Sequence, residues 1–213
     1  MSDHDDDFNF EPMPGLPALP PSGEEVLWQG RPDSLRLARE AYGLTWVAGY
    51  FGLIVGWQAM RGFAEAGMAG ALAFGIPNLL LGLVGCGIVF LLAHAQARTT
   101  VYTITSARVV LRIGAALSVS INLPFRQIES AGLDLKGNGS GTIALALSEG
   151  AKLSWLTLWP HVRPWRLARP EPALRCIPDA ARVARLLAEA AETRLAEPVI
   201  LRADPPAAAL AAE

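Results

Sequence analysis

The residues best suited to binding chemistry lie in one proline-rich segment in the last third of the chain. It reads LWPHVRPWRLARP over residues 158–170, and its candidate interaction residues are Trp159, His161, Arg163, Trp165 and Arg166. The prolines keep this segment out of a helix or a strand ladder, which predicts a rigid loop. Trp and Arg are enriched at the energetic centres of interfaces, and arginines near a membrane attract anionic headgroups. The segment is therefore either a structural loop packed on its domain or a docking surface for a protein subunit or membrane lipids.

Elsewhere the sequence offers no set of residues for catalysis or metal binding. Cys86 and Cys176 form no CxxC pair, the chain has 3 histidines, and no Ser, His and Asp spacing or carboxylate pair emerges. Residues 136–142 read KGNGSGT, which lacks the Gly-Lys-Ser/Thr ending of a phosphate-binding loop and predicts a hairpin loop instead. With 18 Lys and Arg against 20 Asp and Glu, the net charge of −2 argues against a nucleic-acid partner. We therefore expect a protein that is not an enzyme and needs no cofactor or metal.

Two long stretches without charged residues precede the candidate segment and predict a membrane anchor. Of the 213 residues, 52% are hydrophobic and 18% are charged, against roughly 25% charged in an ordinary soluble domain. Residues 41–60 and 66–97 contain no Asp, Glu, Lys or Arg, and about 20 mostly apolar residues suffice to cross a bilayer as a helix. We expect a transmembrane hairpin with a first helix over 42–60, a short periplasmic loop over 61–68, and a second helix over 69–93 kinked at Pro77.

Arginines flanking these stretches predict the orientation of the hairpin. Arg31, Arg36 and Arg39 precede the first stretch, Arg98, Arg108 and Arg112 follow the second, and the connecting loop holds Arg61 beside Glu65. Because positive residues stay on the cytoplasmic side, both termini are expected in the cytoplasm. The localisation expected is the inner membrane of a bacterium, as a multi-pass protein.

Gly52 and Gly56 place two small residues on one face of the first predicted helix. Such spacing lets another helix backbone approach closely. The partner is either the second helix of the same hairpin or a helix of another protein.

Beyond the hairpin, the pattern changes to that of an antiparallel β-sheet closed by a helix. Alternation of period two predicts strands over 100–105, 108–113, 117–123, 127–135, 141–147 and 151–158. After Pro178, apolar residues recur at helical spacing from Val183 to Ala191, which predicts a C-terminal helix packed on the sheet. The fold class expected is thus a membrane α+β protein, with a two-helix transmembrane hairpin followed by a cytoplasmic antiparallel sheet and a capping helix.

The predicted boundaries divide the chain into further segments. Residues 1–22 are acidic and then proline-rich and are expected to be a disordered tail. Residues 23–41 are expected to form a cytoplasmic strand, a turn and an interfacial segment. The β domain is expected over 99–195, and the Ala- and Pro-rich residues 196–213 are expected to be a second disordered tail.

Several motifs in order resemble known families. Residues 102–114, YTITSARVVLRIG, resemble the opening strand pair of bacterial pleckstrin-homology-like (PH-like) domains attached to membrane hairpins. Together, LWQGRP at 27–32, NLPFRQIESA at 122–131 and LWPHVRPWR at 158–166, with Arg169-Pro170 beyond, resemble the PuhB family of photosynthetic-complex assembly proteins of purple bacteria. The resemblance covers residues 23–195 and implies a PH-like sheet capped by a C-terminal helix.

This resemblance also implies a function. It implies an assembly factor whose partners are reaction-centre and light-harvesting 1 subunits and membrane lipids, with a homodimer as a further arrangement. In that setting, His161 is also a candidate axial ligand of bacteriochlorophyll. The alternative is a lipid-binding or scaffolding PH-like membrane protein unrelated to photosynthesis.

Overall fold

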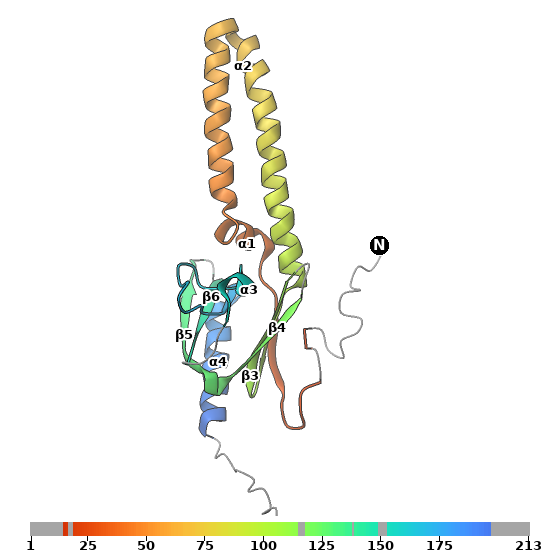
Figure 1. The fold of residues 1–213 in the computed structure, drawn as a ribbon, viewed down its shortest axis with the longest axis vertical. Helices are drawn as coiled ribbons and strands as arrows, with labels where there is room; N and C mark the ends of the chain where they lie inside the picture. The colour runs from red at the N-terminus through yellow and green to blue at the C-terminus, as the bar shows by residue number, and fades with distance from the viewer. Residues whose placement is uncertain (1–14, 17–18, 115–117, 138, 149–152, 197–213) are drawn as a thin grey trace, which may run out of the picture.

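A computed structural model describes residues 15–16, 19–114, 118–137, 139–148 and 153–196. It shows a long helical segment standing on a β domain (Figure 1). The elements in chain order are β1 (Val26–Gly30), α1 (Ser34–Glu40), α2 (Leu44–Thr99), β2 (Val101–Thr105), β3 (Arg108–Ile113), β4 (Val119–Pro124), the 3-10 turn η2 (Phe125–Gln127), β5 (Ile128–Leu135), β6 (Gly141–Leu147), α3 (Trp155–Leu158), β7 (Ala173–Ile177) and α4 (Ala180–Ala196).

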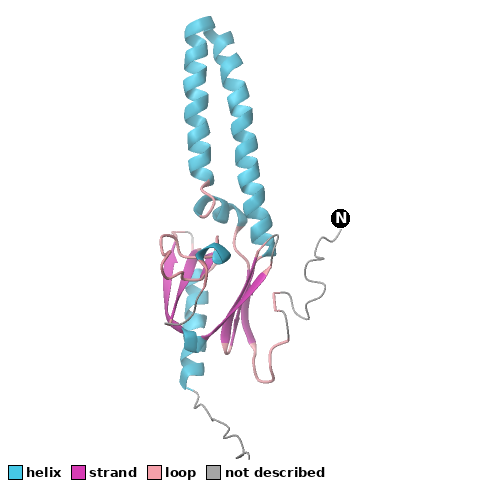
Figure 2. Cartoon of the chain, in the orientation of Figure 1, coloured by secondary structure: helices cyan, strands magenta, loops and turns pink. Residues whose placement is uncertain are grey.

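Helix α2 folds back on itself at one break. Ala66 and Gly67 have non-helical dihedral angles, and Gly67 has a φ of 61°, a left-handed conformation that glycine adopts without strain. The chain reverses there, so the first arm (residues 44–65) and the second arm (residues 68–99) lie side by side (Figure 2). Gly62 and Gly70 allow the closest approach, because a Cβ on Gly62 would lie 2.2 Å from the Gly70 carbonyl oxygen.

The structure departs from the predicted boundaries of the anchor. Residues 61–68 were expected to be a loop, but helix continues on both sides of the two-residue break. The non-helical angles within α2 fall at this break and not at Pro77, the expected kink. Among the described residues, one helix, α2, is long and apolar enough to cross a membrane, where the sequence predicted two separate spanning helices.

Among the described residues, seven strands form two antiparallel sheets, where the sequence predicted one antiparallel sheet. The four-stranded sheet has the order β1-β2-β3-β4, and the three-stranded sheet has the order β5-β6-β7. Trp28 of β1 pairs with Ile104 of β2, so residues 23–41 begin as part of the β domain. The core lies between the sheets and α4 and includes Tyr102, Ile104, Leu111, Phe125, Ile143, Leu145, Leu174 and Leu187.

Five predicted strands are confirmed within two residues of their ends, and one prediction is wrong. Residues 155–158 of the sixth predicted strand form the short helix α3, and residues 151–152 lie outside the described residues. Strand β7 was missed altogether. Its five residues, ALRCI, are all buried and show no clear alternation of apolar and polar side chains, and they follow directly on the proline-rich segment that was predicted to be a loop.

The C-terminal helix is confirmed as α4, which buries Val183, Leu187 and Ala190 against the sheets. Leu186 and Ala191, also expected on this face, are partly buried there. The acidic tip of the predicted N-terminal tail and residues 197–213 lie outside the described residues. Within the tail over 1–22, the prediction is wrong at Leu16, which is buried.

Candidate functional site

The candidate segment forms a loop between α3 and β7, here called the Trp/Arg loop (residues 159–171). His161 lies inside it, fully buried. Its Nδ1 lies 2.5 Å from the Tyr102 hydroxyl, and its Nε2 lies 3.1 Å from Thr100 Oγ1 and 3.4 Å from Gln96 Nε2. Thr100 donates its hydroxyl proton to the Gln96 carbonyl, so its oxygen is left to accept from His161. The tautomer with the proton on Nε2 satisfies both hydroxyl contacts.

Burial, together with the charge of Arg175, lowers the pKa of His161 to about 3. The ring is therefore neutral at physiological pH and holds the loop to β2 and to the end of α2. Both ring nitrogens already have protein partners. The predictions that His161 docks a partner and that it ligates bacteriochlorophyll are therefore wrong for this structure, because neither nitrogen faces an exposed surface.

Arg175 on β7 ties the loop to the helices. Its Nη1 donates to the Pro160 carbonyl oxygen at 3.1 Å, and its Nη2 donates to the Glu40 carbonyl oxygen at 3.3 Å. The backbone N–H of Arg175 also donates to the Tyr102 hydroxyl. Sequence reasoning missed Tyr102 and Arg175, although an arginine within the apolar run ALRCI was a signal that could have been followed.

Trp159 rests on the start of the long helix. Its ring meets that of Tyr42 edge to face, with centroids 4.9 Å apart, and Tyr42 lies between α1 and α2. Trp159 keeps 40% of its surface exposed. The packing alternative is therefore correct in part for this residue, although its ring packs against the helical base and not the sheet.

Trp165 is far more exposed than Trp159: 94% of its surface is accessible, and its backbone is left-handed, with a φ of 66°. The arginines beside it share one carboxylate. Arg163 donates to Glu171 at 2.9 Å, and Arg166 approaches the other oxygen of Glu171 at 3.6 Å. Because Glu171 is largely buried, it fixes both guanidinium groups on the surface of the loop.

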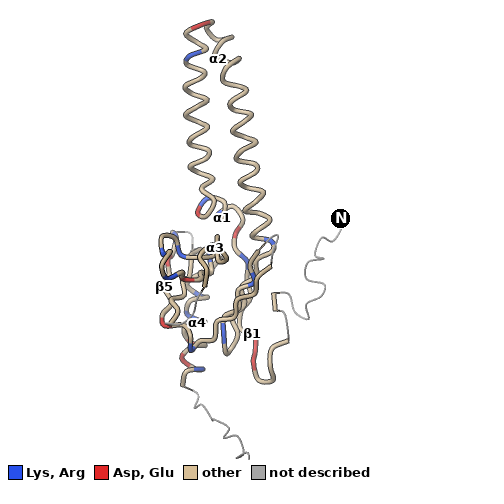
Figure 3. The backbone as a smooth tube through the Cα atoms, in the orientation of Figure 1, with Lys and Arg blue, Asp and Glu red and all other residues tan. Residues whose placement is uncertain are grey.

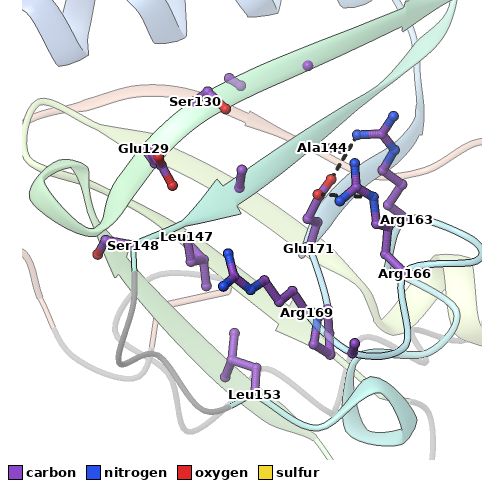
Figure 4. Close-up of a pocket in the computed structure, with 15 residues that line it drawn as sticks. Glu129, Ser130, Ala144, Leu147, Ser148, Leu153, Arg163, Arg166, Arg169 and Glu171 are labelled. Carbon is purple, nitrogen blue, oxygen red and sulfur yellow. Dashed lines mark hydrogen bonds and ion pairs between the residues drawn. The ribbon is translucent and has the colours of Figure 1, made fainter.

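An open groove of about 770 Å³ runs between this loop and the outer face of β5 and β6. Small residues form its floor, including Ser130, Gly132, Ala144 and Ala146. Figure 4 shows Arg169 reaching across the groove beside Leu147 and Leu153, while Arg163 and Arg166 turn to Glu171. A second groove of about 630 Å³ is lined by Glu40, Trp165 and Arg175, so Trp165 and the end of α1 border the same groove.

The chemistry that these grooves offer is anion and apolar contact. Guanidinium groups bind carboxylates and phosphates, and an exposed indole offers apolar contact with a polar edge. Among the described residues, no group of three or more His, Cys, Asp or Glu is placed to hold a metal ion.

Gly52 and Gly56 do not lie between the arms of α2. A Cβ added at either position would meet nothing within 4 Å. The arms instead meet at Gly62 with Gly70, and at Gly82 with Phe51. The packing alternative is wrong for Gly52 and Gly56, whose face is left open.

Comparison with known proteins places the fold in context. The family model described as "Bacterial PH domain" matches residues 43–191. The chain is 49% identical to an uncharacterized 23.7 kDa protein in the puhA 5′ region of Rhodobacter capsulatus, over 99% of both chains. A solved structure of a DUF1696 family protein with a pleckstrin-homology domain, from Shewanella loihica, matches at 14% identity and a TM-score of 0.29, covering 43% of this chain and 71% of that one.

Proposed function

The chain belongs to the bacterial PH domain family, and on that premise we propose that it is a non-enzymatic, membrane-anchored assembly factor of the PuhB type. Its proposed partners are the reaction-centre and light-harvesting 1 subunits. The Rhodobacter capsulatus relative is described as a protein of the puhA 5′ region, and this gene neighbourhood supports the proposal. The resemblance of residues 23–195 to the PuhB family of photosynthetic-complex assembly proteins supports it as well.

The observation that carries the membrane anchoring in this proposal is the bare apolar surface of both arms of α2. Trp46 is 85% exposed and Leu53 is 78% exposed, and exposed leucines follow along the second arm. Figure 3 shows charged residues at the turn and at the base of α2 but not along the arms. Exposing so large an apolar surface to water is unfavourable, which strongly favours its burial. Lipid chains or other membrane helices can bury it.

Each arm is long enough to cross a bilayer, which takes about 20 residues. In the proposed topology both arms cross, so that the turn near Arg61 and Glu65 is periplasmic. The arginine-rich flanks then place both termini and the β domain on the cytoplasmic side of the inner membrane.

The outward face at Gly52 and Gly56 supports docking of another membrane helix. Small residues permit close backbone approach, and the space next to both positions is open. We assign this face to a partner subunit helix. A homodimer through the glycine face is the competing arrangement.

The test is a chromosomal deletion complemented with variants, followed by near-infrared absorption spectra of membranes from cells induced for photosynthesis. Gly52→Leu with Gly56→Leu is expected to lower the reaction-centre and light-harvesting 1 bands while pigment synthesis continues. Gly87→Leu is the matched control. Gly87 lies on the other arm, and a Cβ added there also meets nothing within 4 Å. Unchanged bands in the deletion strain would reject the assembly role.

A PH-like scaffold or lipid-binding protein unrelated to photosynthesis is the second candidate, because the PH-like fold fits it equally. Growth separates the two. The assembly factor predicts a defect confined to photosynthetic growth, whereas the scaffold predicts a defect under respiratory growth as well. Co-isolation of the tagged protein with reaction-centre polypeptides gives an independent measurement.

A further inference from the structure

We propose that Trp165 and the arginines of the Trp/Arg loop form an interfacial anchor, which lies in the anionic headgroup layer of the leaflet where α2 begins. The proposed occupant is lipid, and the inference rests on the membrane topology proposed above. It adds a second attachment of the β domain to the bilayer, apart from the covalent link through α2.

The first argument is depth. Trp159 contacts Tyr42, which is four residues before Trp46 on the first turn of α2. An exposed tryptophan at the end of an apolar helix marks the boundary between hydrocarbon and headgroups. The Tyr42–Trp159 contact therefore places the start of the Trp/Arg loop close to that boundary.

The second argument is how firmly the loop is held there. Arg175 binds the carbonyl oxygens of both Glu40 and Pro160, so the end of α1 and the start of the loop are joined through one side chain. Trp165 and Glu40 also line the same groove. Since Glu40 lies four residues before α2, Trp165 borders a groove at the membrane end of the domain.

The third argument is what the loop presents. Trp165 exposes 94% of its surface. Exposure of an indole to water is unfavourable, whereas the membrane interface accommodates its apolar ring and polar edge. Residues 159–171 contain three arginines against one glutamate, and His161 is neutral, so the loop carries a net positive charge. An aromatic anchor beside a net positive charge is complementary to anionic lipid, and each basic residue near such a surface strengthens binding about fivefold.

The experiment places single cysteines in the full chain, in a Cys86→Ala background, and labels them with a nitrobenzoxadiazole maleimide. Cys176 is buried, and burial together with the neighbouring Glu40 raises its pKa to about 12, so it does not compete for the label. Trp165→Cys tests the anchor, Leu53→Cys reports insertion of α2, and Leu195→Cys near the end of α4 is the exposed control. Each protein is reconstituted in phosphatidylcholine nanodiscs with and without phosphatidylglycerol, carrying nitroxide lipids as quenchers.

We expect blue-shifted emission and lipid quenching at positions 53 and 165, and water-like emission at 195. Quenching at 165 should weaken without phosphatidylglycerol or after Arg163→Gln with Arg166→Gln. If position 53 is quenched and 165 behaves like 195, the anchor is rejected while the membrane topology stands, and the surface is left to a protein partner. If position 53 is also water-like, the topology and the anchor both fall.

A second measurement keeps the native indole. Brominated lipids quench tryptophan at short range, so the difference in quenching between the unmodified chain and Trp165→Phe isolates one of the six tryptophans. Stronger quenching of the unmodified chain than of Trp165→Phe supports the anchor. Equal quenching of the two proteins contradicts it.

Discussion

The hydroxyl of Tyr102 lies 2.5 Å from Nδ1 of His161, and this contact joins the central strand pair to the Trp/Arg loop. Thr100, the residue that follows α2, contacts the other ring nitrogen. One buried imidazole therefore links the end of the long helix, strand β2 and the loop.

Removing the ring is expected to cost the domain much of its stability. His161→Ala leaves a cavity and strips the hydroxyls of Tyr102 and Thr100 of a buried partner, which together should lower the free energy of unfolding by about 2–4 kcal/mol. Urea unfolding of the full chain in detergent micelles, followed by circular dichroism, measures this change. Leu195→Ala is the control and should change the free energy by less than about 0.5 kcal/mol, because its side chain is exposed near the end of α4. Equal effects of the two substitutions would contradict the assigned role of His161.

Acid should destabilise the domain through the same residue. Burial and Arg175 lower the pKa of His161 to about 3 in the folded protein, against about 6.5 in the unfolded chain. Above pH 6.5 neither the folded nor the unfolded state binds a proton at His161, and between roughly pH 6.5 and 3 only the unfolded state does. The free energy of unfolding therefore decreases as the pH is lowered through this range, by up to about 1.4 kcal/mol per pH unit. The measurement is unfolding free energy against pH for the wild type and His161→Gln. Since carboxylates titrate in both proteins, the difference between the curves reports His161, and parallel curves would refute the assignment.

How far the sequence could predict this structure depended on whether the signal was local. Strands β2 and β3 are buried almost throughout but are separated by the short turn at Ser106 and Ala107, and β4 alternates between exposed and buried residues, so their boundaries could be read directly. Strand β7 could not, because Ala173–Ile177 is a short apolar run without alternation that directly follows the proline-rich loop. The helix α3 was misread for a similar reason, since WLTL fits a strand as well as a helical turn.

The candidate site shows the same limit. Composition singled out the Trp/Arg loop as a chemically distinct segment, but it could not give the direction of the side chains. His161 is buried by Tyr102, which is 59 residues away in sequence, and no local pattern announces that contact. Likewise, the spacing of Gly52 and Gly56 shows that they share a helix face, but not whether that face meets the other arm.

Arm packing in α2 should depend on Gly62 and not on Gly52. A Cβ at Gly62 would lie 2.2 Å from the backbone oxygen of Gly70, which cannot rotate away, so Gly62→Ala must push the arms apart. Overpacking of this kind typically costs about 1–3 kcal/mol. Gly52→Ala meets open space and should be neutral or slightly stabilising through its helix propensity. Thermal unfolding in micelles compares the two variants, and a larger loss for Gly52→Ala would overturn the arm register described here.

Strand β1 should be held to the domain by one ion pair. Arg108 donates from Nε and Nη2 to the two oxygens of Glu24, each at 2.7 Å. Burial alone would raise the pKa of Glu24, but the hydrogen bonds from Arg108 and Thr105 and the charge of Arg108 outweigh it and hold the pKa below its usual value. The carboxylate is therefore charged in the folded protein, and its contribution to stability is present above about pH 4.5 and is lost as the pH falls below that.

Glu24→Gln removes the charge and keeps the shape of the side chain. Because charge-assisted hydrogen bonds contribute about 1.5–3 kcal/mol, we expect a loss of that order and faster amide hydrogen exchange in β1, which pairs with β2 beside this contact. Glu25→Gln is the matched control, one residue away on an exposed side chain. Hydrogen-exchange mass spectrometry of residues 24–30 distinguishes the two variants. If amide exchange in β1 is equally slow in the two variants, the ion pair does not hold the strand. In that case β1 is retained by its backbone pairing with β2 and by the packing of Trp28 on the core.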